Sequence, residues 1–366
     1  QFRDEDIEFI LFPSTPHRHI HPKIKEMMKH NHIMKLRIPR PMFRGALPIG
    51  LLDMLLGNAI RARILRRVAL FERPEFIHAM EFQHGAYLVA DAIRNIQRNS
   101  HFIATNWGSD IYWFQRFANH RSRIIEVLSI CDSYSAECER DHELANQLGF
   151  RGQHLAVIPN SGGFTESQLN HAADFLVPSS RKVIVIKGYT GFVGRADVAL
   201  KAIELVAENL HGYEMVVFSS DLKSRRIANQ VARRTGLNIT TYRRNELSHE
   251  RMLALFGRSR IYIGISESDA ISTSMLEALA CGAFPIQTNT SCADEWIVDG
   301  TSGFIVDLNN RTSISFALRA ALENDALVDA ASKINLATAQ QRLSTSAVSE
   351  SIRGFYIVQT SRPCLD

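Results

Sequence analysis

Apolar and polar positions in the second half of the chain form two alternating kinds of segment. Short runs that are apolar nearly throughout are followed by longer runs with apolar residues at helical spacing. The expected strands are Val183–Ile186, Glu214–Phe218, Ile239–Tyr242, Ile261–Ile265, Ala283–Gln287 and Gly303–Val306. The expected helices are Asp197–Leu210, Ser224–Thr235, Ser248–Arg258 and one near Ser274–Ala280. Continuously apolar strands separated by helices predict a parallel sheet that is covered by helices on both faces.

The first half of the chain shows a similar but less regular alternation. The strand candidates are Ile7–Phe12, Phe76–Met80, Phe102–Thr105, Val127–Ile130 and Leu155–Ile158. Helical periodicity is found between them, in Tyr87–Gln97 and Ser135–Leu148. After Val306 the pattern becomes all helical and ends in a long segment, Thr345–Thr360. Together the two halves predict an α/β protein with two Rossmann-like domains.

A polar stretch separates the two halves. It contains Pro-Asn-Ser-Gly-Gly at positions 159–163 and few periodic apolar residues up to about Ser180, which predicts a domain boundary. We place an N-terminal domain at residues 1–165, a C-terminal domain at 166–343 and a terminal helix at 344–366. Because open parallel sheets bind ligands at the carboxyl ends of their strands, we expect the ligand site in a cleft between the two domains.

Composition narrows the class of protein. The chain has 366 residues, of which 45% are hydrophobic and 22% charged, as is typical of a soluble globular protein with more than one core. No run approaches the roughly 18 consecutive apolar residues of a membrane-spanning helix. The chain opens at Gln1 and not at a methionine, so we expect its true N-terminus to lie upstream.

Charge and cysteine usage change this picture in two ways. The net charge of +4 gives no global support to nucleic-acid binding. Between Arg18 and Arg73, however, thirteen Lys and Arg residues stand against three acids, which indicates an anionic partner near the N-terminal domain. The five cysteines form no C-x-x-C pair, and the histidines at 17–32 lack metal-ligand spacing. We therefore expect reduced thiols in a cytoplasmic protein and no metal site.

Part of that basic region is also apolar. Residues 49–70 contain Ile-Gly-Leu-Leu-Asp-Met-Leu-Leu followed by Arg61, Arg63, Arg66 and Arg67. An apolar segment flanked by arginines is typical of a stretch that lies on an anionic membrane surface. A core helix with a solvated basic face fits the same pattern equally well.

The stretch with the most chemistry runs from Gly264 to Ile286. A strand ends near Ile265, a polar loop follows, and a helix begins near Ser274, so the free amides of its first turn suit a phosphate group. Ser272 and Thr273 would supply amides and hydroxyls. The carboxylates of Asp269 and Glu277 would accept hydrogen bonds from sugar hydroxyls. As an alternative, Ser274-x-x-Glu277 is a capping box in which Glu277 only fixes the start of the helix.

These residues resemble the donor-site signature of the family 4 glycosyltransferases of GT-B fold. The matching pattern is Asp269-x7-Glu277-Ala-Leu-Ala-Cys-Gly-Ala-Phe-Pro-Ile, then Glu295, then Gly300-x-x-Gly303-Phe-Ile-Val. The resemblance implies that Asp269 lies near the donor sugar, that Glu277 contacts the nucleotide ribose, and that loop amides around Ser272 and Thr273 hold the diphosphate. The first acid of the family pattern is usually Glu, so Asp269 shortens the reach by one methylene.

The family also carries two cations at the start of the second domain, which neutralise the leaving diphosphate. In the loop Ile186-Lys-Gly-Tyr-Thr-Gly-Phe-Val-Gly-Arg-Ala196 the best matches are Lys187 and Arg195, although the usual spacing is not kept. Gly188 and Gly194 would let the backbone approach a phosphate closely. The alternative is that both cations are solvated loop charges.

Weaker similarities are found in the first half. Asp110 matches the family's Thr-x-His-Gly-x-Asp pattern, but Trp107 stands where a His is frequent. Glu81 and His84 follow another strand and are acceptor-side candidates, although a lone His is more often structural. The resemblance also implies that the terminal helix packs back on the N-terminal domain.

We therefore expect a retaining glycosyltransferase that moves a hexose-type sugar from a nucleotide diphosphate sugar to a hydroxyl of a glycan or lipid-linked acceptor. Lys187, Arg195, Asp269 and Asp110 are its candidate catalytic residues. The resemblance implies no metal or other cofactor. The protein is expected to be cytoplasmic and peripheral on the inner face of a membrane. Two other classes remain open: a nucleotide-sugar epimerase of the same fold, and a non-catalytic module that binds nucleotide sugars or glycans.

Overall fold

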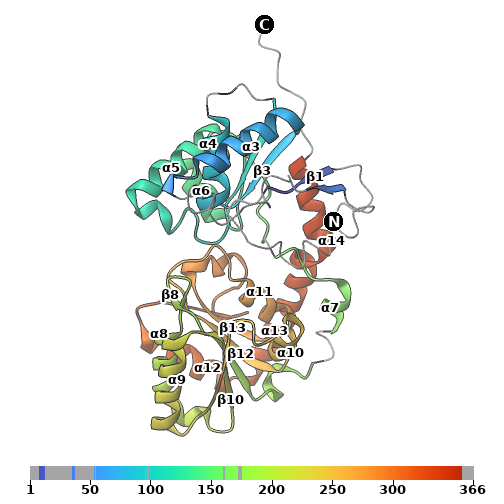
Figure 1. The fold of residues 1–366 in the computed structure, drawn as a ribbon. Coiled ribbons are helices and arrows are strands. Elements are labelled where there is room, and N and C mark those ends of the chain that lie inside the picture. Colours follow the sequence, from blue (N-terminus) through green and yellow to red (C-terminus); the bar gives the residue numbers. More distant parts are fainter. Residues whose placement is uncertain are drawn as a thin grey trace. The chain divides into compact units, whose positions relative to one another are not determined.

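The computed structural model describes residues 8–12, 35–37, 53, 55–94, 96, 99–159, 161–171 and 175–356. Its chain folds into two compact units (Figure 1). The first comprises residues 1–135 and 142–155, and the second comprises 136–141 and 156–366. The histidine-rich stretch 17–32, the end of the expected terminal helix (357–360) and most of the apolar run at 49–56 lie outside the described residues.

The first unit is built on a parallel sheet with the strand order β3-β4-β5-β6. These strands are β3 (Phe76–Met80), β4 (His101–Thr105), β5 (Ser133–Ser135) and β6 (Gln153–His154). The helices around it are α3 (Ala59–Glu72), a π-helical turn η2 (Phe82–Ala86), α4 (Tyr87–Ile93), a 3-10 turn η3 (Phe114–Arg116), α5 (Ala118–Ile130) and α6 (Glu139–Gln147). Two further short strands, β1 (Glu8–Ile10) and β2 (Lys35–Arg37), pair with each other in parallel.

Two strands expected in this half are wrong. Val127–Ile130 forms the last turn of α5 and not a strand, because Ile124, Val127 and Leu128 are buried together at helical spacing. The strand at this point is instead Ser133–Ser135, whose residues are all buried. Leu155–Ile158 forms no strand, and the edge strand is the preceding Gln153–His154.

The second unit is built on a six-stranded parallel sheet with the order β11-β10-β7-β12-β13-β14. Its strands are β7 (Val183–Lys187), β10 (Glu214–Ser220), β11 (Asn238–Arg243), β12 (Ser259–Gly264), β13 (Phe284–Thr288) and β14 (Phe304–Val306). All six expected strands are therefore confirmed, with ends that shift by one or two residues. When the six strands are numbered by their order along the chain, their order in the sheet is 3-2-1-4-5-6, the doubly wound arrangement. The direction in which successive strands are added reverses between β7 and β12.

Helices cover both faces of this sheet. The helices of this unit are α7 (Glu166–His171), α8 (Ala196–Glu204), α9 (Leu222–Thr235), α10 (His249–Gly257), α11 (Thr273–Ala280), α12 (Arg311–Glu323), α13 (Asp325–Leu343) and α14 (Thr345–Arg353). Short 3-10 turns add η5 (Pro178–Ser180), η6 (Ala207–Leu210), η7 (Asn289–Ser291), η8 (Ala293–Glu295) and η9 (Gly354–Tyr356), and β8 (Thr190–Gly191) and β9 (Gly194–Arg195) form a hairpin. The all-helical end after Val306 is confirmed.

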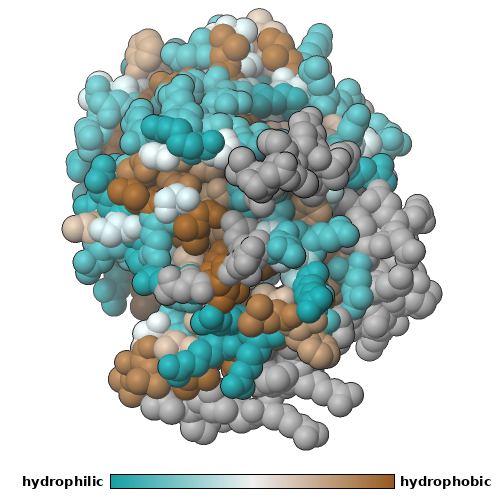
Figure 2. Space-filling model, turned by 90° about the horizontal axis from the view of Figure 1, so that it is seen from above, coloured by the Kyte–Doolittle hydropathy of each residue, from teal (hydrophilic) through white to brown (hydrophobic). Residues whose placement is uncertain are grey.

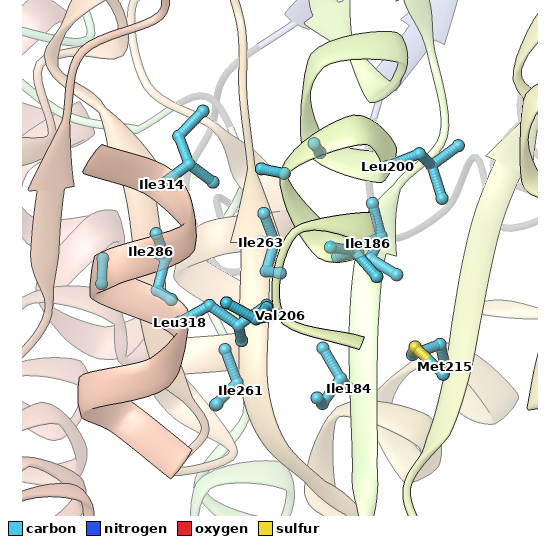
Figure 3. Packing of buried hydrophobic residues seen from close by; sticks show 14 of the residues in the cluster. Ile184, Ile186, Leu200, Val206, Met215, Ile261, Ile263, Ile286, Ile314 and Leu318 are labelled. Atoms are coloured by element: carbon cyan, nitrogen blue, oxygen red, sulfur yellow. The ribbon is translucent and has the colours of Figure 1, made fainter. Parts of the chain in front are cut away.

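The core lies in two layers, one on each face of the sheet. One layer packs α8, α9 and α12 on the strands, and Figure 3 shows Ile184, Ile261 and Ile314 among its side chains. The other layer packs α10 and α11 on the opposite face, with α13 contributing to both. Continuous apolar strands are required here because neither face of the sheet meets water. Among the described residues, no helix is long and apolar enough to cross a membrane.

Candidate active site

The switch point of the second sheet brings together most of the residues singled out in the sequence. Lys187 is the last residue of β7, and the loop 265–272 follows β12, the neighbouring strand. Because both strands run parallel, their carboxyl ends meet at one edge of the sheet. Helix α11 begins at that edge with Ser272 as its N-cap residue.

Lys187 lies at the centre of this arrangement. Its ammonium group donates to Asp269 Oδ2 at 3.2 Å and lies 3.4 Å from Ser272 Oγ. The residue is only 6% exposed. Burial by itself would lower the pKa of Lys187, but the charge of Asp269 outweighs it and raises the pKa above its usual value. The lysine is therefore a charged group held inside the site.

A hydroxyl network supports the loop around Ser272. Tyr262, which is buried in β12, has its hydroxyl 3.3 Å from Ser272 Oγ and 3.0 Å from Ser274 Oγ. Burial raises the pKa of Tyr262, so its hydroxyl keeps its proton at neutral pH. Thr273 is exposed at the start of the helix. No side chain caps α11, so the first amides of this helix are left to bind water or an anion.

Arg195 lies in the neighbouring β8–β9 loop, where its charge is already balanced. It pairs with Asp197 at 3.0 Å and also with Glu267. The hydrogen bond to Asp197 is the main reason that the pKa of Arg195 lies above its usual value. Two carboxylates around one guanidinium leave less positive charge for a ligand than the sequence pattern suggests.

Glu277 does not serve as a helix cap, so the capping-box interpretation is wrong. The N-cap is Ser272, and the Glu277 carboxylate instead lies 2.8 Å from His249 Nε2 on α10. Burial raises the pKa of Glu277, while His249 acts in the opposite direction. Glu277 therefore has no capping role, and a ligand that binds its carboxylate has to compete with His249.

At the two positions where a glycine was expected to let a phosphate approach, the packing of neighbouring atoms leaves no room for a side chain. A Cβ atom on Gly188 would collide with the Phe218 carbonyl oxygen and lie 2.9 Å from Ser220 Cα. A Cβ atom on Gly194 would lie 2.6 Å from Tyr189 Cβ. Both glycines are therefore needed by the protein's own chain, whether or not a ligand approaches them.

Tyr262, His249 and Arg140 lie at the site, although no sequence pattern pointed to them. The Arg140 guanidinium donates to the carbonyl oxygens of Asp269 and Thr290, both at 3.0 Å. It is also paired with Asp141 at 2.9 Å. Arg140 thereby fixes the loop that carries Asp269. No local sequence signal could reveal this contact, because it joins residues 129 positions apart.

The candidates in the first unit have local hydrogen bonds of their own. The Asp110 carboxylate accepts from the backbone N–H groups of Phe82 and Trp107, both at 2.9 Å. Glu81 accepts from the N–H of His84 and from that of Gly85 at 3.1 Å. Glu81 has φ 144°, which is unusual for a non-glycine residue. Trp107 is 48% exposed and His84 is exposed, so these two side chains are accessible within the unit.

Comparison with known proteins agrees with the second unit's fold. Residues 168–338 match the family described as "Glycosyl transferases group 1". No curated protein sequence gives a significant match.

Solved structures resemble a larger part of the chain. Sucrose-phosphate synthase from Thermosynechococcus elongatus has a TM-score of 0.68 at 12% identity, covering 88% of this chain and 82% of its own. The Anabaena protein HepE in complex with UDP and glucose has a TM-score of 0.65 at 14% identity, with 92% and 89% covered. A trehalose 6-phosphate synthase from Burkholderia multivorans reaches 0.64 at 14% identity, with 81% and 73% covered. At such identities the likeness concerns the fold, which is that of GT-B glycosyltransferases.

Proposed function

We propose that this chain, with a glycosyltransferase group 1 region on a GT-B fold, transfers a hexose-type sugar from a nucleotide diphosphate sugar to a hydroxyl group. The acceptor is a glycan or a lipid-linked glycan. The observation that carries the proposal is the buried ammonium group of Lys187 beside Asp269 and the uncapped start of α11. A lysine and free helix amides at the switch point of a parallel sheet suit a diphosphate.

In the proposed reaction the bond between the anomeric carbon and the diphosphate oxygen breaks, and the acceptor oxygen bonds to that carbon with retained configuration. Negative charge then builds up on the leaving diphosphate, where Lys187 and the α11 amides would stabilise it. The leaving phosphate takes the acceptor's proton. Because the cations and amides supply positive charge, the step needs no metal ion or other cofactor.

The remaining donor contacts follow from the same placement. Asp269 would bind the sugar hydroxyls once the diphosphate takes over the Lys187 ammonium group. Glu277 would accept from the ribose hydroxyls, in competition with His249. Arg195 would reach the diphosphate only by releasing Asp197 or Glu267. We therefore rank Lys187 above Arg195 as the group that stabilises the leaving diphosphate.

On the acceptor side, Asp110 is proposed to act by positioning. Its carboxylate holds the backbone amides of Phe82 and Trp107. It therefore fixes the segment that presents Trp107 and the turn of Glu81 and His84. Those side chains are the proposed contacts of the acceptor glycan.

The test is a thermal-shift and calorimetric screen against UDP, GDP, ADP, CMP and their common sugar conjugates. One nucleotide diphosphate should stabilise the native chain by mass action, and Glu277→Ala should weaken this binding about tenfold or more. The matched control is Glu208→Ala, an exposed glutamate in η6, which should bind as the native chain does. Absence of binding by every nucleotide would overturn the proposal.

Two other activities would give different products from the same donor. An epimerase would convert the donor into another sugar nucleotide without any acceptor. A non-catalytic module would bind the nucleotide tightly and give no turnover with any acceptor. To separate these outcomes, the donor is incubated with and without glycan acceptors. Mass spectrometry then identifies the products, and the sugar of the recovered nucleotide is determined.

We further propose that α3 docks the protein on the cytoplasmic face of an anionic membrane. Its outer face carries the exposed Arg63, Arg66 and Arg67. Leu70 and Phe71 at its end are 52% and 82% exposed. Figure 2 shows that hydrophobic and hydrophilic groups are interleaved on the surface seen from above. Arginines beside exposed apolar side chains suit an interface with anionic lipid headgroups.

Vesicle sedimentation tests this docking. The native chain should sediment with phosphatidylserine-containing vesicles at low salt, and a Leu70→Ser, Phe71→Ser double variant should bind several-fold more weakly. Leu222→Ser, which alters an equally exposed leucine of the second unit (66% exposed), is the control. Equal recovery of the native chain with anionic and zwitterionic vesicles would contradict the idea.

A further inference from the structure

Two thiols and a carboxylate converge beside the donor loop without a role in the proposed reaction. Cys138, Cys292 and Glu295 each present one ligand atom, and these atoms lie within 4.8 Å of one another. Cys138 precedes α6 within residues 136–141, which belong to the second unit. Cys292 lies between η7 and η8, and Glu295 ends η8. Both thiols are buried, at 0% and 3% exposure.

We propose that Cys138, Cys292 and Glu295 bind one Zn²⁺ ion, with a water molecule as the fourth ligand. Thiolates and a carboxylate are common zinc ligands, and ligand atoms of a tetrahedral site lie about 3.5–3.8 Å apart. The three side chains therefore need to move by only about 1 Å to close on an ion. None of the three ligands is a proposed contact of the donor, and the inference does not depend on glycosyl transfer.

The charges around the three ligands suit a divalent cation. Two thiolates and a carboxylate carry three negative charges, of which Zn²⁺ neutralises two. The guanidinium of Arg140, two residues after Cys138, supplies positive charge beside the third, and it is shared with Asp141, to which Arg140 is paired at 2.9 Å. A thiolate pair with a metal is therefore electrostatically compatible with this buried position.

The ligands are also held in place by their surroundings. The Glu295 carboxylate accepts from the Glu139 N–H at 3.0 and 3.1 Å, which orients it as outer contacts orient metal ligands. Cys292 has φ 49° and ψ 41°, a left-handed conformation that is unfavourable for a non-glycine residue. The strained backbone aims this side chain at Cys138 and Ala270, with which it is packed.

The proposed ion would join two segments that shape the donor site. Cys138 is two residues before Arg140, which holds the carbonyl oxygens of Asp269 and Thr290. Cys292 is two residues after Thr290. An ion between the two cysteines would therefore fix Arg140 against the loop that carries Asp269. Metal binding would stabilise that loop without touching the substrate.

The test is a titration of the metal-free full-length chain with Cd²⁺, which has an ultraviolet charge-transfer band with thiolates. The protein is kept reduced with a phosphine that does not bind the ion. We expect the band to saturate at one equivalent, and Zn²⁺ to displace Cd²⁺ and raise the Tm. Cys138→Ser and Cys292→Ser should each lose at least half of the band and bind at least tenfold more weakly.

Two matched controls alter buried cysteines elsewhere. Cys131→Ser and Cys281→Ser remove thiols that contact the Leu128 and Leu253 carbonyl oxygens, and they should titrate as the native chain does. Glu295→Gln keeps both thiols and should still show the band, with affinity reduced tenfold or more. This variant keeps the test decisive if a cysteine variant does not fold.

Three results would overturn the proposal. They are the absence of a band at one equivalent in the native chain, an equal loss in Cys131→Ser, and unchanged affinity in Glu295→Gln. Oxidation with glutathione disulfide gives a fourth. If Cys138 and Cys292 form a disulfide and release two molecules of reduced glutathione, while the reduced chain binds no ion, the pair is a redox pair and not a metal site.

Discussion

Among the described residues, Lys187 forms an ion pair with one carboxylate, that of Asp269. A lysine that is 6% exposed is costly to bury unless a carboxylate pairs with it, and Asp269 provides that carboxylate at 3.2 Å. The pair keeps the ammonium group charged and in place before a donor arrives. A diphosphate that displaces Asp269 would then bind an ammonium group that is already charged and in position. Preorganised cations of this kind stabilise a leaving group best.

Lys187→Met tests this role. We expect kcat to fall about 10²-fold or more because the leaving diphosphate loses its cation, with a smaller change in KM. The control is Lys182→Met, an exposed lysine just before the other end of β7. A kcat within about threefold of the native value would remove Lys187 from the proposed mechanism.

Gly188→Ala tests the packing of a second residue in the same loop. A Cβ atom would meet the backbone of Phe218 and Ser220, so we expect the free energy of unfolding to fall by about 1–3 kcal/mol. Gly191→Ala is the control, since a Cβ atom there has no neighbour within 4 Å. If urea unfolding gave the two variants equal stability, the backbone around Gly188 would have to accommodate a Cβ atom without cost, which contradicts this account.

At the scale of elements, apolar runs predict burial better than they predict the kind of element. The run Val127–Ile130 is apolar and short, as a buried strand would be. In the structure it is the end of α5, because its buried residues continue the face that begins at Ile124. Periodicity over four residues cannot separate these two possibilities. In the second unit, caps and glycines flank the runs of the six-stranded sheet, and all six of its strands were predicted, although the short hairpin of β8 and β9 was not.

Helix α9 offers a test of one such cap. Asp221 forms a capping box with Ser224, and its carboxylate also accepts from the Thr190 N–H at 2.9 Å. We expect Asp221→Ala to lower the free energy of unfolding by about 1–2 kcal/mol. Arg233→Ala, an exposed change in the last turn of the same helix, should have an effect below about 0.5 kcal/mol.

The pH dependence of this cap has a defined sign. Burial would raise the pKa of Asp221, but the hydrogen bonds from Thr190 and Ser224 outweigh it and lower the pKa below 3.8. The contribution of Asp221 is therefore complete at neutral pH and is lost as the pH falls below about 4. A difference between native and Asp221→Ala that stayed constant down to pH 3 would contradict this account.

At the scale of the whole molecule, the partly buried His78 and the buried His142 make stability sensitive to mild acid. Burial lowers the pKa of His78 to about 4, and burial with the charge of His154 lowers that of His142 to about 4. Between pH 6.5 and about 4 the unfolded chain binds protons that the folded chain does not. The free energy of unfolding should therefore fall as the pH falls, by about 2 kcal/mol or more between pH 7 and pH 5.

Urea unfolding at the two pH values measures this effect. His142→Phe keeps the ring contacts with Tyr134 and His154 and should reduce the loss in acid by about half. His211→Phe changes an exposed histidine and should leave the loss unchanged. If both variants lose stability in acid as the native chain does, the acid response arises elsewhere.

The sequence by itself determined the fold class, and it predicted the region of the site. Apolar periodicity reports burial within a few residues, so it predicted the six parallel strands and the all-helical end. The pattern from Asp269 to Gly303 resembles a family signature, and this resemblance implied a donor site there. The same resemblance matched Lys187 to one of the family's two cations.

Only the tertiary structure decided which groups meet. Glu277 contacts His249 instead of capping its helix, Arg195 is already paired, and Arg140 reaches Asp269 from far along the chain. Cys138 meets Cys292 and Glu295 in the same way. These contacts depend on how loops pack at the end of a sheet. Local propensity and periodicity carry no information about pairings between residues more than a hundred positions apart.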